Sequence, residues 1–150
     1  MSRVEAGPQA STTSAAVRVG LGILAIFQGV VGVWASLWPR SFYRSFPIPG
    51  HNWVSLLPPY NQHLVRDTGE LSLALTVVLT AAALTGQRLL SVVAVVAVAV
   101  YAVPHAVFHA FHLEGFPTTD AVAQMIGIGL QLVVTVIVGW LLWRERGRTP

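Results

Sequence analysis

Four long apolar runs constrain the fold of this chain more than any other feature of its sequence. They extend from Val19 to Trp38, from Leu71 to Leu84, from Leu89 to Phe108 and from Ala121 to Trp143. Each is close to, or readily extends to, the roughly 20 residues that a helix needs to cross the hydrocarbon core of a bilayer. The runs lack the alternation of transmembrane barrel strands, so they predict helices. We therefore expect an all-α, integral membrane four-helix bundle.

The amino-acid composition agrees with a membrane location. The 150 residues are 54% hydrophobic and 10% charged, whereas an ordinary soluble domain carries about 25% charged residues. The formal net charge of +3 comes from nine arginines against six acids. Because these arginines form no basic face, binding to nucleic acid is a poor interpretation. The absence of cysteine excludes disulfides, thiolate nucleophiles and thiolate metal ligands.

The chain is expected to divide into a membrane domain flanked by two tails. Residues 1–17 are rich in Ser, Thr and Ala without an apolar period, which predicts a disordered cytoplasmic tail. Residues 18–144 form the transmembrane domain, in which an aromatic, proline-rich outer loop joins the first two helices. Residues 145–150 form a short basic tail. The first apolar run exceeds the length of a signal-peptide core, so we expect an uncleaved helix.

The placement of the arginines predicts how the chain is oriented. Six of the nine lie in the two tails and in the turn before the third helix, whereas Arg40, Arg44 and Arg66 would lie on the opposite side. Arginine is enriched on the cytoplasmic side of membrane proteins. We therefore expect a multi-pass protein of the plasma membrane with both termini in the cytoplasm. All five histidines then lie near the outer end.

Three helices carry polar residues at helical spacing near this outer end. The three sets are His63, Asp67 and Glu70; His105, His109 and His112; and Asp120, Gln124 and Gln131. Within each set the spacing places the side chains on one face of a helix. A polar stripe that faces lipid is costly, so we expect all three stripes to face the interior of the bundle. They would then line a polar pocket that opens outward.

The histidine stripe predicts a ligand site in this pocket. Imidazoles at i and i+4 can reach one cation, and side chains from a facing helix can complete the coordination shell. Zinc, iron or copper, or a haem, would suit imidazole with carboxylate. The predicted metal ligands are His63, Asp67, His105, His109 and His112, and the predicted cofactor-binding residues include Arg66, Asp67, Glu70 and Gln124.

Structural interpretations of the same residues stay open. The histidines can lie in the membrane interface, hydrogen-bonded to water or loop carbonyls, or form a site that responds to protons. Arg66 and Glu70 can form an ordinary i, i+4 pair, and Arg66 with Asp67 can be paired charges that face the bundle. Asp120 follows two threonines, so we expect it to cap the start of its helix.

The segments PPYNQHLVRDTG and VPHAVFH, with the four spans and the aromatic first loop, resemble DoxX-like four-helix bacterial membrane proteins of a subgroup of unknown function. The resemblance covers about residues 17–140. It implies that Asn61, His63, Arg66, Asp67, His105 and His109 are grouped together. Some relatives in the wider group are linked to quinone-dependent sulfur oxidation and to redox complexes, which implies a quinone or an electron-transfer partner. A small residue is usual in the family where Glu70 stands, so this chain departs from the pattern there.

These features favour a multi-pass membrane protein whose His/Asp/Arg pocket binds a metal ion, a haem or a quinone. One alternative is a non-catalytic accessory or assembly subunit, whose partner is a membrane complex or a second copy and whose polar stripes are structural. Another alternative is a small transporter, although no inverted repeat is evident. No serine lies in a recognisable nucleophile context, and the sequence specifies no enzymatic reaction.

Overall fold

The computed structural model describes residues 12–147, and most of them lie in five α-helices. The helices are α1 (Ala15–Leu37), α2 (Pro39–Ser45), α3 (Gln62–Thr85), α4 (Arg88–Ala110) and α5 (Thr118–Glu145). Helices α1, α3, α4 and α5 are long and apolar enough to cross a membrane. The predicted all-helical class with four candidate spans is therefore confirmed, and it fits a multi-pass membrane protein. Residues 1–11 and 148–150 of the two predicted tails lie outside the described residues.

The second span begins before the apolar run that starts at Leu71. Helix α3 starts at Gln62 and takes in the charged residues that the apolar run needed to reach full length. It starts there because Asn61 occupies the N-cap position. Its Oδ1 accepts hydrogen bonds from the backbone N–H groups of His63 at 3.1 Å and Leu64 at 3.3 Å, which satisfies donors that a helix start leaves without partners.

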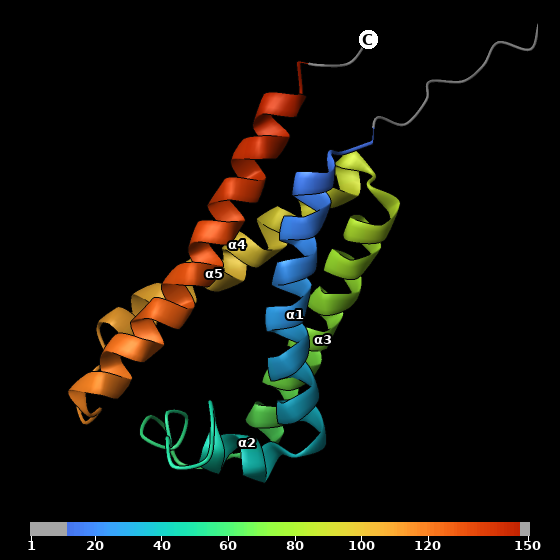
Figure 1. The fold of residues 1–150 in the computed structure, drawn as a ribbon. Coiled ribbons are helices and arrows are strands. Elements are labelled where there is room, and N and C mark those ends of the chain that lie inside the picture. The colour runs from blue at the N-terminus through green and yellow to red at the C-terminus, as the bar shows by residue number, and fades with distance from the viewer. Residues whose placement is uncertain (1–11, 148–150) are drawn as a thin grey trace, which may run out of the picture.

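The four long helices form two pairs that diverge along the molecule. Helix α1 lies along α3, and α4 packs against α5. The two pairs meet near the end where the described termini lie and separate toward α2 (Figure 1). The buried apolar core follows this arrangement, because all its members except Ala102 lie in the halves of the helices nearer the termini: Val17, Leu21, Leu24, Ala25, Leu79, Ala82, Ala94, Val95, Val98, Ala102, Val138 and Leu142.

Small residues bring α1 and α3 into close contact. A Cβ atom added to Gly69 would lie 2.5 Å from the backbone nitrogen of Ser36, and one added to Gly32 would lie 3.0 Å from the backbone nitrogen of Leu73. Such close approach gives membrane helices the van der Waals contact that holds them together. The glycines of the first apolar run predict this packing. It is confirmed for Gly32, whereas Gly22 has nothing within 4 Å of an added Cβ.

The last turn of α3 is closed by a glycine and by an arginine from α1. Gly86 has a φ of 64°, in the left-handed region that glycine adopts at helix ends. The Nε of Arg18 donates to the carbonyl of Ala83 at 2.7 Å, and its Nη2 donates to the carbonyl of Leu84 at 3.0 Å. These carbonyls have no partner within the helix. Arg18 is therefore a structural cap of α3.

Replacing Arg18 with glutamine is expected to lower the free energy of unfolding by about 1 kcal/mol, because two hydrogen bonds from an exposed charged donor are lost. Thermal unfolding of the protein in mild detergent measures this. Arg88→Gln is the matched control, since Arg88 begins α4 at the same end and makes no side-chain hydrogen bond within residues 12–147. Equal melting temperatures for the two variants would contradict the capping role.

The segment between α1 and α3 is held against the end of α1 by aromatic contacts. The rings of Trp34, Phe42, Phe46 and Trp53 form a contact series with centroid distances from 4.8 to 6.1 Å. The hydroxyl group of Tyr43 donates to the carbonyl of Pro58 at 2.8 Å. These contacts anchor residues 46–60, which run from α2 back to α3.

Candidate functional site

The polar stripe of α3 lies on an exposed face, contrary to the prediction that it faces the interior. The side chain of His63 is 82% exposed and that of Asp67 is 43% exposed, and His63 Nε2 lies 3.3 Å from Asp67 Oδ2. Arg66 and Glu70 are exposed as well. The physical reason is that Gly69 lies against α1, which turns the stripe away from the other helices.

The polar stripes of α4 and α5, in contrast, meet each other. His109 of α4 is buried and lies beside Gln124 of α5, which is also buried. The ring of His105 is 4.4 Å from that of His109 in a T-shaped arrangement, and Tyr101 stacks on His105 at 5.1 Å. We refer to Tyr101, His105, His109 and Gln124 as the α4–α5 cluster. It joins half-buried and buried polar groups along one helix interface.

Several buried polar atoms at this interface have no hydrogen-bond partner among residues 12–147. They are His109 Nδ1, Gln124 Oε1 and, further along α5, Gln131 Nε2. An unpaired buried polar group costs about 1–3 kcal/mol in a protein interior, and lipid offers such a group no partner. An imidazole nitrogen can donate or accept, an amide oxygen accepts and an amide nitrogen donates. The interface therefore holds buried donors and acceptors that are unpaired among the described residues.

Asp120 pairs with a histidine from a distant part of the chain. Its Oδ1 lies 2.8 Å from Nδ1 of His51, which ties residues 46–60 to the start of α5. The expectation that Asp120 stands at the start of this helix is confirmed, but its carboxylate does not cap the helix. The N-cap position is Pro117, and Asp120 lies within the first turn. There its charge complements the helix dipole, but its hydrogen bond goes to His51.

The remaining predicted site residues have structural partners or stand apart. His112 is exposed, its ring stacks on that of Phe108 at 3.9 Å, and its Nδ1 lies 2.7 Å from the Phe108 carbonyl. The side chain of Asn61 caps α3.

Sequence reasoning missed two residues. Tyr101 stands at i−4 from His105, so helical spacing could have found it, whereas His51 is 69 positions from Asp120, and no local pattern joins them.

The predicted metal ligands do not converge. Among the described residues, no group of three or more His, Asp or Glu side chains could hold a metal ion. His63 and Asp67 pair with each other on α3, whereas His105 and His109 belong to the α4–α5 cluster. The metal site stays a prediction, with its residues divided between two parts of the structure.

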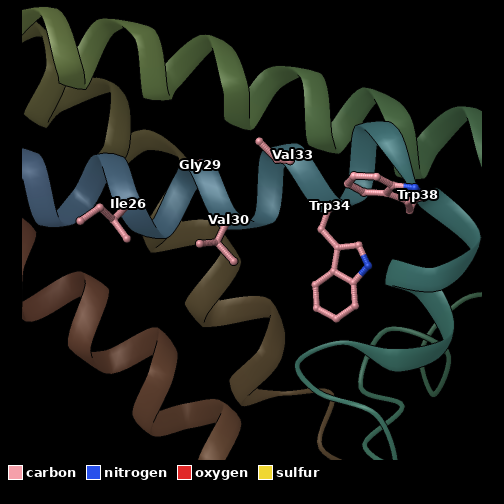
Figure 2. Close-up of a pocket in the computed structure, with 6 residues that line it drawn as sticks. All are labelled: Ile26, Gly29, Val30, Val33, Trp34 and Trp38. Atoms are coloured by element: carbon pink, nitrogen blue, oxygen red, sulfur yellow. The ribbon is translucent and has the colours of Figure 1, made fainter.

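Two hollows mark the surface at the end that carries α2. An apolar groove of about 700 Å³ is lined by Ile26, Gly29, Val30, Val33 and Trp34 of α1 and by Trp38, which follows this helix. Figure 2 shows Trp34 projecting from α1 away from α3 and toward the segment that follows α2. A smaller, more polar hollow of about 360 Å³ is lined by Trp38, Pro39, Arg40, Ser41, Tyr60, Gln62 and Arg66. No histidine lines either hollow.

Comparisons of this chain with protein-family models, with curated proteins and with solved structures found no match. The resemblance to DoxX-like proteins stays a prediction. The function is therefore argued from the chemistry of the site.

Proposed function

We propose that this chain is a multi-pass protein of the plasma membrane that binds a small, membrane-soluble molecule at the α4–α5 cluster. One observation carries the proposal. Buried His109 and Gln124 lie side by side within hydrogen-bonding reach of each other, yet His109 Nδ1 and Gln124 Oε1 have no partner at good hydrogen-bond geometry among the described residues. Polar side chains within membrane helices are costly to insert, so they are retained mainly where they serve a function. A ligand that hydrogen-bonds both side chains would offset that cost.

A quinone is the class of ligand that suits this set of groups best. Its carbonyl oxygens can accept hydrogen bonds from the imidazole N–H of His109 and from the amide N–H groups of Gln124. In the reduced form, the hydroxyl groups of the quinol can donate to the unpaired Oε1 of Gln124. The stacked rings of Tyr101 and His105 offer a flat surface for an aromatic head group. A metal ion is supported less well, because residues 12–147 group too few ligands.

The proposed orientation places this site in the outer half of the membrane. The described ends of the chain lie at one end of the molecule and α2 lies at the other (Figure 1). Arg18, Arg88, Arg144 and Arg146 belong to the helix ends on the side of the termini. Arginine is enriched in the loops and tails on the cytoplasmic side of membrane proteins. We therefore propose that both termini lie in the cytoplasm. The α4–α5 cluster lies toward the opposite ends of its helices and therefore nearer the outer surface.

Binding of a short-chain quinone, ubiquinone-1, tests the proposal. Isothermal titration of the protein in lipid nanodiscs is expected to show saturable binding above that of empty nanodiscs. In the His109→Ala/Gln124→Ala variant we expect at least a tenfold weaker affinity. Each lost hydrogen bond costs about 1 kcal/mol, and about 1.4 kcal/mol corresponds to a factor of ten.

His112→Ala is the matched control for this titration. His112 lies one turn beyond His109, but it is exposed and bonds only to its own helix end among the described residues. Its replacement is expected to leave the affinity unchanged within twofold. The proposal fails if the wild-type protein binds no more quinone than empty nanodiscs, or if His112→Ala weakens binding as much as the double variant.

A further inference from the structure

We infer a second site, specific for an oxyanion such as a phosphate group, in the hollow of about 360 Å³ between α2 and α3. We call it the Arg40/Arg66 hollow after the two arginines that line it. It shares no residue with the α4–α5 cluster, so it is independent of the proposed quinone site.

Two arginines from different helices line this hollow, and no acidic residue does. Arg40 belongs to α2 and Arg66 belongs to α3, and no Asp or Glu is among the lining residues. The ion pairs within residues 12–147 are His51 with Asp120 and His63 with Asp67. Neither arginine is therefore neutralised by a described carboxylate. Like charges that line one hollow repel each other, so an anion bound between them is favoured.

The acids nearest to Arg66 in the sequence do not neutralise it. Asp67 is directed to His63, with 3.3 Å between Oδ2 and Nε2. Glu70, one turn further along α3, makes no ion pair with Arg66 within the described residues. The i, i+4 pair that the sequence allowed is therefore not formed. The guanidinium of Arg66 therefore makes no ion pair within the described residues and can bind an anion from outside them.

Further side chains of the hollow supply orientation and hydrogen-bond donors. The guanidinium of Arg40 lies 5.7 Å from the centre of the Tyr60 ring, a contact that orients it. Ser41 Oγ accepts from Trp34 Nε1 at 3.2 Å, so its own hydrogen can point into the hollow. Gln62 Oε1 accepts from the Tyr60 hydroxyl at 3.5 Å, and its amide nitrogen can donate. Guanidinium, hydroxyl and amide donors together match the acceptor oxygens of phosphate.

The phosphate can come from a lipid or from solution. Trp38 lines both the Arg40/Arg66 hollow and the apolar groove on α1, so the two are adjacent. A phospholipid could place its phosphate between the arginines and one acyl chain along Ile26, Val30 and Val33. Free phosphate would use the hollow alone. The chemistry recognised is the same in both cases, and the experiment separates the two sources.

Lipid retention in native mass spectrometry is the first measurement. After purification in a neutral detergent with equal phosphatidylglycerol and phosphatidylcholine, the wild-type protein is expected to retain phosphatidylglycerol preferentially. Arg40→Gln and Arg66→Gln should each reduce this preference about tenfold. Arg44→Gln is the control, since Arg44 is an exposed arginine of α2 outside the hollow, and it should change the preference less than twofold. Arg40→Lys/Arg66→Lys should keep part of it, because charge is retained but the bidentate geometry is lost.

Inorganic phosphate is the second probe. Phosphate that binds in a titration and displaces phosphatidylglycerol supports the site and assigns it to a soluble anion. Retained phosphatidylglycerol that phosphate does not displace supports the site and assigns it to lipid head groups. Equal retention of the two lipids with no phosphate binding would overturn the inference, as would an equal loss in Arg44→Gln and Arg40→Gln. Circular dichroism melts check folding, and the lysine variant serves as the test if the glutamine variants do not fold.

Discussion

Replacing Gly69 with alanine is expected to destabilise the protein by forcing α1 and α3 apart. The new Cβ would lie 2.5 Å from the backbone nitrogen of Ser36, 2.6 Å from its Oγ and 2.9 Å from the backbone carbon of Ala35. Backbone atoms of a helix cannot rotate away, so α1 and α3 must separate. Overpacking of this kind costs about 1–3 kcal/mol. Thermal unfolding in detergent should show a clearly lower melting temperature.

Gly22→Ala is the matched control for this substitution. Gly22 lies in α1, but an added Cβ would meet nothing within 4 Å. Alanine favours a helix over glycine by about 1 kcal/mol, so this variant should be as stable as the wild-type protein or slightly more stable. If Gly69→Ala melts at the same temperature as Gly22→Ala, the close α1–α3 contact does not hold in the membrane protein.

Breaking the His51–Asp120 pair is expected to loosen residues 46–60. The pair joins this segment to α5 with a distance of 2.8 Å, at the end where the two helix pairs diverge. Loss of one hydrogen bond to a charged group costs about 1.5–3 kcal/mol, which corresponds to at least tenfold faster local opening. In Asp120→Ala, hydrogen–deuterium exchange should therefore become at least tenfold faster in residues 46–60 and stay unchanged in the core half of α1.

Two further variants show whether the effect arises from the pair itself. His51→Ala should accelerate exchange in the same segment, and the double variant should add little to either single variant, as expected for partners in one contact. Glu114→Ala is the control, since Glu114 is an exposed acid in the loop before α5. Unchanged exchange in Asp120→Ala, or an equal effect of Glu114→Ala, would show that the pair does not hold the segment.

The sequence allowed the helices to be placed more accurately than their contacts. The four predicted spans correspond to α1, α3, α4 and α5, because the cost of unpaired backbone groups in lipid requires long apolar helices. Helical spacing also placed His105 and His109 on one face of α4. It could not show that Gln124 would meet His109, or that the stripe of His63 and Asp67 would be exposed. Spacing fixes a face of one helix, whereas the neighbour of that face depends on how helices pack.

Single residues show where this limit lies. Asn61 was grouped with the candidate site, yet its carboxamide caps α3, a local role that its position just before a helix allows. Asp120 was expected to make such a local cap, yet it bonds to His51. For both residues the sequence shows that the side chain can accept hydrogen bonds. It does not show whether the donor lies nearby in the same helix or in a distant part of the chain.

The sequence by itself determined that this chain forms apolar helices long enough to span a membrane, and which polar residues share a helix face. It also determined where the helices begin and end within a few residues, except that α3 begins at Gln62, well before the apolar run that starts at Leu71. These properties follow from local hydrophobicity and backbone hydrogen bonding. Only the tertiary structure decided that α1 meets α3 through Gly69, that the helix pairs diverge, and that Arg40 and Arg66 line one hollow. These properties depend on the shape of side chains far apart in the chain, which no periodicity encodes.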